Sequence, residues 1–217
     1  HGTEQSQSDA LFLRHTYLST LAKLMAFIQY SGGHLPNQKQ IRPAITGELF
    51  KSRGIQNFIE EDFFTWISRP AADGVDQRLA EIILARLGDY NLQSIKEDVL
   101  KELYQNLVTQ EERHNLGEYY TPDWLVEEIV QEELGEDVTS SVLDPTCGSG
   151  TFLFRTIHYK RENSGLEGEN LLNHIEENVV GIDVHPLALI IARVNYILAL
   201  GDLLRDARTG EFSVPVY

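Results

Sequence analysis

The stretch Val142–Leu153 constrains the possible folds of this chain more than any other part of the sequence. A short apolar run ends in Asp144, a turn containing Gly148 and Gly150 follows, and a helical pattern begins after the second glycine. Glycine has no side chain, so such a turn lets a ligand approach the backbone closely. We expect a buried strand, a tight turn and a helix, with Asp144 at the carboxyl end of the strand, where open α/β sheets bind their ligands.

Two well-known glycine turns do not fit this stretch. A phosphate-binding P-loop has Lys after its last glycine, whereas Thr151 follows Gly150. A dinucleotide-binding turn has a third glycine where this chain has Leu153, which disfavours a nicotinamide-dependent oxidoreductase. The acid at Asp144 is unfavourable beside a pyrophosphate, but it suits a cationic group such as an amino-acid ammonium. An ordinary strand–turn–helix connection without a ligand is the remaining alternative.

A second acidic strand end lies further along the chain. Asn178–Val184 is an apolar run that carries Asp183 near its end. Pro186 follows at the expected start of a long apolar helix that continues to Leu200. An acid at the end of the second strand can accept hydrogen bonds from both hydroxyls of a ribose; the alternative is a solvated strand-end acid. We assign the polar residues Glu162–Asn170, between the glycine turn and this strand, to a loop.

Three motifs together resemble one enzyme family. Asp144–Leu153 resembles motif I of S-adenosylmethionine-dependent DNA adenine-N6 methyltransferases, Gly117–Pro122 resembles their motif X, and Gly181–Pro186 resembles their motif II. The order X, I, II resembles the γ-type arrangement of type I modification subunits and fused restriction–modification enzymes. The resemblance implies that S-adenosylmethionine is the cofactor. It assigns cofactor-binding roles to Tyr120, Thr121, Pro122, Asp144, Thr146, Gly148, Gly150, Asp183 and Val184.

The resemblance also implies what these residues contact. Asp144 would bind the ammonium of the methionine end, Asp183 would hold the ribose, and Val184 would pack near the adenine ring. Tyr120, Thr121 and Pro122 would close over the methionine carboxylate, although core packing is the alternative for the tyrosine. Independently of the resemblance, Thr121 can N-cap a helix that has Pro122 at its first position. The free N–H groups at such a helix start suit a carboxylate.

The rest of the chain predicts an α/β fold in two unequal parts. Residues 1–8 read as a flexible or tag-derived lead, residues 9–115 as an all-helical domain, and residues 116–217 as a partial Rossmann-like methyltransferase domain with parallel strands. Apolar spacing predicts helices over Leu11–Tyr30, Ala44–Arg53, Asn57–Ser68, Val75–Leu87, Asp98–Arg113 and Asp123–Leu134. A third strand is expected at Val214–Tyr217. Its unpaired edge would favour a homodimer.

Composition limits the partners and the chemistry. The net charge is −15, whereas DNA binding requires Lys and Arg against phosphates, so a DNA-binding face would lie mainly outside this chain. Cys147 is the only cysteine, which excludes a disulfide within the chain and fits a cytoplasmic protein; we interpret it as a small turn residue. No two histidines stand four residues apart, so we predict no metal site on a helix face. No apolar run is long enough to span a membrane.

The catalytic motif of the resembled family is missing. That motif, Asn or Asp followed by Pro-Pro and an aromatic residue, holds a flipped adenine for attack on the methyl group, and this chain has no two adjacent prolines. We therefore expect the N-terminal, cofactor-binding portion of a DNA adenine-N6 methyltransferase from a restriction–modification or phage-defence system, inactive alone, with DNA and a specificity or restriction subunit as partners. The alternatives are a methyltransferase acting on protein glutamine or RNA, or a non-catalytic helical interaction module.

Overall fold

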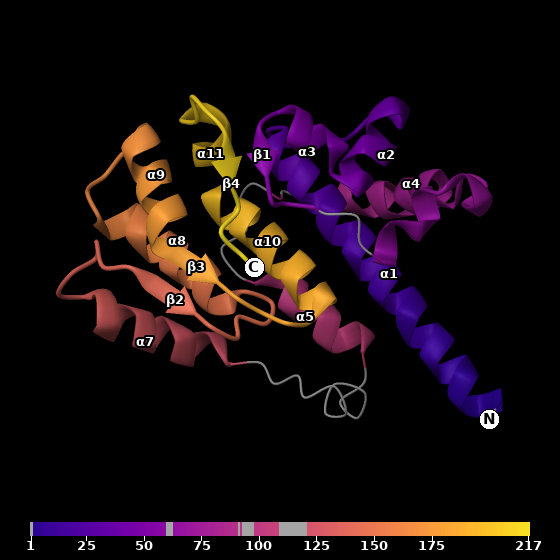
Figure 1. Cartoon of the computed structure of the whole chain (residues 1–217), viewed down its shortest axis with the longest axis horizontal. Coiled ribbons are helices and arrows are strands. Elements are labelled where there is room, and N and C mark those ends of the chain that lie inside the picture. The colour runs from indigo at the N-terminus through magenta and orange to yellow at the C-terminus, as the bar shows by residue number, and fades with distance from the viewer. Residues whose placement is uncertain (1, 60–62, 91, 93–97, 109–120) are drawn as a thin grey trace.

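The structure of the chain, a computed structural model, describes residues 2–59, 63–90, 92, 98–108 and 121–217, and side chains from residue 8 onward (Figure 1). It is mostly helical, with a few short parallel strands. The helices are α1 (Gly2–Tyr30), α2 (Gln38–Thr46), α3 (Glu48–Ser52), α4 (Val75–Leu87), α5 (Val99–Leu107), α7 (Asp123–Leu134), α8 (Thr151–Asn163), α9 (Gly168–Asn178), α10 (Pro186–Leu200) and α11 (Asp202–Asp206), with the 3-10 helices η1 (Phe63–Ser68) and η2 (Pro70–Ala72). The strands are β1 (Ile55–Gln56), β2 (Val142–Asp144), β3 (Val179–Gly181) and β4 (Phe212–Ser213).

The two strands predicted around the glycine turn are confirmed and are parallel. The first was predicted to be buried, which is wrong, because Leu143 is 59% exposed. Leu143 of β2 lies opposite Val180 of β3, and Asp144 lies opposite Gly181, so the carboxyl ends of the two strands are adjacent. Residues 215–217 lie beside β3 and extend the sheet, with Gly181 and Val216 paired in a parallel bridge. These parallel pairings, connected by helices, confirm the α/β class.

The predicted free edge of the third strand is wrong. Val214 and Val216 are completely buried. The Asn57 side-chain amide donates to both of their carbonyl oxygens, at 2.6 Å and 3.1 Å. Nε of Arg193 donates to the carbonyl of Val216 at 3.0 Å. Side chains of the same chain therefore occupy the acceptors that a second copy would need, and the predicted homodimer through this edge loses its physical basis.

One face of this small sheet is covered and the other is not. α8 packs against β2 and β3. The register places Leu143, Ile182 and Tyr217 on a common face of the sheet. These three side chains are 59%, 40% and 57% exposed. A doubly wound sheet has helices on both faces. The described residues therefore form an α/β fold in which helices cover one face of the sheet, and the predicted Rossmann-like arrangement is not confirmed.

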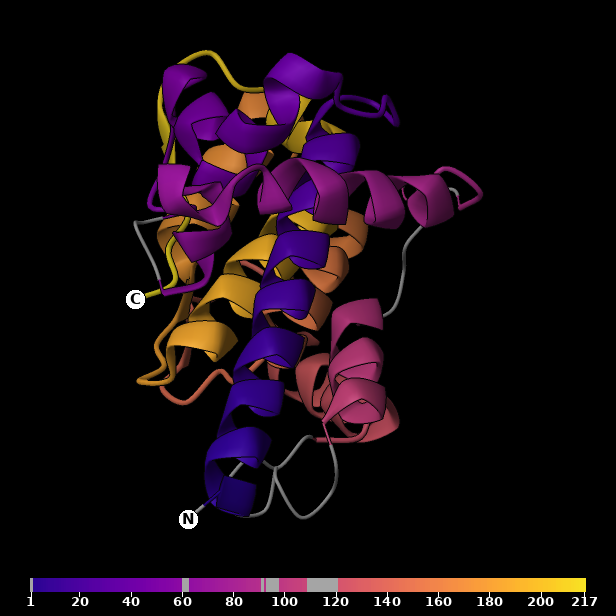
Figure 2. The same cartoon turned by 90° about the vertical axis from the view of Figure 1, so that its right-hand side faces the viewer.

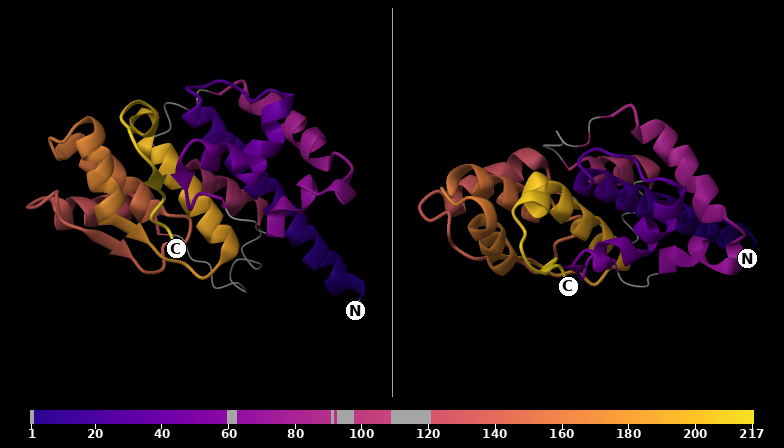
Figure 3. Two further views of the ribbon diagram at one scale, coloured as in Figure 1. Left: turned by 45° about the horizontal axis from the view of Figure 1, so that its top comes forward. Right: turned by 90° about the horizontal axis from the view of Figure 1, so that it is seen from above.

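The larger of two hydrophobic clusters among the described residues spans both predicted domains. It contains α1 residues such as Leu24 together with α8 and α10 residues such as Phe154 and Val194. α1 packs along α10 (Figure 2). Figure 3 shows the N-terminal helices beside the strand-containing part along the long axis of the molecule. The two parts thus bury their apolar surfaces against each other, and the boundary at residues 115 and 116 stays a prediction.

Several helix boundaries differ from the predictions. α1 begins at Gly2, so residues 2–8, predicted as a flexible lead, have a helical backbone continuous with the buried part of the helix. The predicted helix Ala44–Arg53 is divided between α2 and α3 because Gly47 adopts a left-handed conformation, with φ +84°. Of the predicted helix Asn57–Ser68, the residues that the structure describes form the 3-10 helix η1 at Phe63–Ser68, and Asn57 has φ 51°.

The predicted loop Glu162–Asn170 is also wrong. α8 continues to Asn163 and α9 begins at Gly168, so only a short connection separates two helices. Leu171, Leu172 and Ile175 of α9 are buried, at the spacing of one helix face. None of the helices among the described residues has the length and apolar character needed to cross a bilayer.

Candidate functional site

The two glycines of the turn have different structural roles. Both have positive φ, +53° for Gly148 and +82° for Gly150, a region that L side chains disfavour. A Cβ atom at Gly150 would lie 3.1 Å from Cα and Cβ of Ala192 in α10, so this glycine permits close packing of the turn on that helix. A Cβ at Gly148 would meet nothing within 4 Å. Gly148 therefore leaves its backbone open on the side where a ligand could approach.

The acids predicted at the strand ends lie together around this turn. Oδ1 of Asp144 accepts from the backbone N–H of Thr146 at 3.2 Å. The carboxylate of Asp183 accepts from the N–H of Gly148 and from the N–H of His185, each at 2.8 Å. The N–H of Ile182 donates to the Asp144 carbonyl at 2.9 Å. These bonds fix the turn, both strand ends and both carboxylates as one unit.

The electrostatics of the edge favour a cationic group. Partial burial raises the pKa of Asp144 above its ordinary value, and the negative charge of Asp183 raises it further, while the hydrogen bond from Thr146 opposes the shift. A cation placed between two carboxylates relieves their repulsion. The chemistry that fits this edge is therefore an ammonium or sulfonium group beside hydroxyl donors.

The remaining residues of the turn and the second strand end are either buried or open to solvent. Burial raises the pKa of the Cys147 thiol to about 12, so Cys147 stays protonated and serves as a small buried turn residue. Thr146 is exposed, and Val184 is 96% exposed. An apolar side chain so fully exposed, directly after Asp183, is available to cover a flat apolar group.

The predicted N-cap at Thr121 is wrong by one residue. α7 begins at Asp123, Pro122 is its N-cap, and no side chain caps the helix. The carbonyl of Thr121 instead accepts from Nζ of Lys101 at 3.4 Å, and Lys101 also forms an ion pair with Asp123. Asp123 occupies the first turn, where a carboxylate is favoured by the helix dipole. Tyr120, the first predicted residue of this group, lies outside the described residues.

Asp98 was not predicted to belong to the site, yet it holds the glycine turn. It is 1% exposed and caps α5. Its Oδ2 accepts from the hydroxyls of Ser149 and Thr151, at 3.1 Å and 2.8 Å. Its Oδ1 accepts from Nδ2 of Asn195 at 2.7 Å. The sequence signals only the N-cap, because the partners lie about 50–100 residues away.

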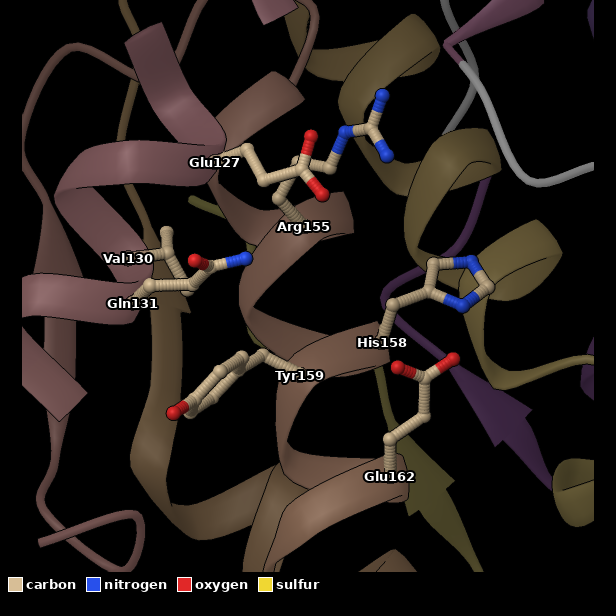
Figure 4. A pocket seen from close by; sticks show the side chains of 7 residues that line it. All are labelled: Glu127, Val130, Gln131, Arg155, His158, Tyr159 and Glu162. Atoms are coloured by element: carbon tan, nitrogen blue, oxygen red, sulfur yellow. The ribbon is translucent and has the colours of Figure 1, made fainter. Parts of the chain in front are cut away.

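A separate pocket of about 220 Å³ lies between α7 and α8. Figure 4 shows the polar side chains around it, which come from both helices: Glu127 and Gln131 from α7, and Arg155, His158, Tyr159 and Glu162 from α8. No predicted cofactor residue lines it. The lining of this pocket carries both acidic and basic groups.

Comparisons with known proteins agree with the motifs. The family model described as N-6 DNA Methylase matches residues 95–206. The "Type I restriction enzyme MjaVII methylase subunit" of Methanocaldococcus jannaschii is 28% identical over 166 residues, which is 74% of this chain and 26% of that protein. The chain thus spans about a quarter of the length of this curated relative. No solved structure matches the chain.

The matched region contains the elements of the site described above. It begins just before Asp98, includes the glycine turn and both strand-end acids, and ends at the last residue of α11. It covers more than half of the chain. The chain therefore belongs to the N-6 DNA methylase family, of the restriction–modification type.

Proposed function

We propose that this chain binds S-adenosylmethionine at the edge where β2 and β3 end, as the cofactor-binding part of a DNA adenine-N6 methyltransferase. One observation carries the proposal: Asp144 and Asp183 lie at adjacent parallel strand ends, on either side of a glycine turn whose Gly148 is open. S-adenosylmethionine has an ammonium, a sulfonium and a ribose with two hydroxyls. These are the groups that a pair of carboxylates can bind.

The proposal keeps the contacts that the family resemblance implies. Asp144 binds the ammonium, and Thr146 and Gly148 line the methionine end. The carboxylate of Asp183 already accepts two backbone hydrogen bonds, but an ionised carboxylate has about four acceptor positions, so it can also accept from ribose hydroxyls. Val184 then packs against the adenine ring. Gly150 acts through its packing on α10.

The segment that begins α7 completes the methionine end in this proposal. Lys101 fixes Thr121 and Asp123, and the open first turn of α7 follows Pro122. Tyr120 keeps its predicted role as the cover of the methionine carboxylate. The sheet would become Rossmann-like when further elements cover its second face. We keep DNA and a specificity or restriction subunit as the proposed partners, because the relative is named as the methylase subunit of a type I restriction enzyme.

The test is calorimetric titration of the purified chain with S-adenosylmethionine. We expect saturable binding that Asp144→Ala abolishes, because the variant removes the charge that binds the ammonium. NAD should not bind, since its pyrophosphate would face both carboxylates. Asp206→Ala is the matched control, because that acid is exposed and forms an ion pair with Arg205. Binding of NAD, or unchanged binding by Asp144→Ala, would contradict the proposal.

A second expectation concerns activity. The chain alone should transfer no methyl group to DNA, because it has no Asn/Asp-Pro-Pro-aromatic motif to hold a flipped adenine. Incubation with labelled S-adenosylmethionine and duplex DNA should leave the DNA unlabelled, with a known adenine methyltransferase as the positive control. Label on adenine N6 would show that another group in the chain replaces this motif.

A further inference from the structure

The first turn of α5 contacts two segments of the proposed cofactor site at once. Asp98, the N-cap, reaches the glycine turn, and Lys101, one helical turn later, reaches the start of α7. The backbone N–H of Lys101 donates to Oδ1 of Asp98 at 3.0 Å, so the two side chains are held in a fixed relation. Nothing in the family resemblance assigns a role to either residue.

The contacts of Asp98 are those of a positioning group. Four donors meet one buried carboxylate: a backbone N–H, two hydroxyls and an amide. None of them is a cation, so the cluster is not a simple ion pair. Nδ2 of Asn195 also donates to the carbonyl of Ser149 at 2.8 Å. The side chain and the backbone of the turn are thus both tied to α5 and α10.

The hydrogen bonds of Asp98 hold the residues next to the two glycines of the turn. Ser149 lies between the two glycines that have positive φ, and Thr151 begins α8 directly after them. Glycines allow many backbone conformations, so a turn of this kind needs outside contacts to hold one of them. Asp98, which is buried, supplies those contacts through Ser149 and Thr151.

We propose that Asp98 is the positioning residue of the cofactor site, fixing the glycine turn in its binding conformation, and that Lys101 extends this to the start of α7. The inference rests on the proposed function for its ligand, but its structural part does not require a ligand. Asp98 touches no proposed cofactor atom. It acts through Ser149 and Thr151, so its effect on affinity is an effect on the geometry of the turn.

The test compares two variants of Asp98 with a matched control. Asp98→Ala removes every acceptor and should weaken S-adenosylmethionine binding about tenfold or more, since a buried donor left without its acceptor costs about that factor. Asp98→Asn should restore binding, because its Oδ1 still accepts and its Nδ2 can donate to the two hydroxyls. Asp76→Ala removes another buried acid at a helix start, which binds Arg42 at 2.7 Å, and should leave affinity unchanged.

A second measurement needs no ligand. Amide hydrogen exchange in the free protein should become about tenfold faster at residues 148–151 in Asp98→Ala, but not in Asp76→Ala. If the wild-type chain binds no S-adenosylmethionine, the proposed function fails and the exchange result alone decides this inference. If Asp98→Ala does not fold, Thr151→Val serves instead, with a smaller effect in the same direction. Equal exchange in both acid variants, or unchanged affinity in a folded Asp98→Ala, would overturn the inference.

Discussion

Gly150→Ala is expected to destabilise the chain by roughly 2–4 kcal/mol, because two costs combine at this position. An L side chain at φ +82° is strained, and the new Cβ would lie 3.1 Å from Cα and Cβ of Ala192. The backbone of α10 cannot rotate away as a side chain could. The displaced turn should also lose S-adenosylmethionine binding. Urea unfolding and calorimetry measure the two effects.

Two other glycines separate these costs. Gly165 has φ +68° with nothing within 4 Å of an added Cβ, so Gly165→Ala should cost only the strain, about 1 kcal/mol, and leave binding intact. Gly148→Ala should cost about the same in stability but weaken binding, because its Cβ would point into the open ligand side. Equal destabilisation by Gly150→Ala and Gly165→Ala would show that the contact with α10 contributes nothing.

The structural elements around the candidate site that the sequence predicts correctly are local. The strand-end acids Asp144 and Asp183 and the turn glycines follow from short runs in which apolar residues, an acid and glycines succeed each other. Such runs specify their own backbone, because glycine permits the turn and short apolar runs bounded by turn residues favour strands. The helix Asp123–Leu134 is confirmed for the same reason.

Asp98 and Lys101 could not be predicted as parts of the site. Their patterns are those of an ordinary N-cap and an ordinary helical lysine. What distinguishes them is tertiary: burial to 1% and 5% exposure, and partners brought in by α7, α8 and α10. The error at Thr121 has the same cause. Thr and Pro fit the cap positions, but the ion pair of Lys101 with Asp123 fixes the helix start one residue later.

Two other incorrect predictions, the loop at Glu162–Asn170 and the free edge of the third strand, have different origins. α9 could have been found, because Leu171, Leu172 and Ile175 follow a helical spacing within a polar stretch. The covered edge at Val214 and Val216 could not, since it depends on Asn57, a residue about 160 positions away with a left-handed backbone. The sequence pattern of a strand does not say which neighbour will cover it.

Leu24→Ala should destabilise both parts of the chain together, by about 2–5 kcal/mol. Leu24 is completely buried in α1, within the cluster that also contains Phe154 and Val194. Because α1 packs along α10, the cavity removes contacts that hold the predicted helical domain to the strand-containing part. Native-state hydrogen exchange should therefore show the same loss of protection in α4 and in α8.

The matched control is Leu13→Ala, the same substitution on the same helix at a side chain that is 56% exposed. It should change the free energy of unfolding by no more than about 0.5 kcal/mol. If Leu24→Ala instead lowers protection in α2 and α4 while α8 and α10 keep theirs, the two parts unfold separately and the boundary predicted at residues 115 and 116 is a true domain boundary. A common loss would mean that the glycine turn depends for its stability on the N-terminal helix, since α10 contacts both α1 and the turn at Ala192.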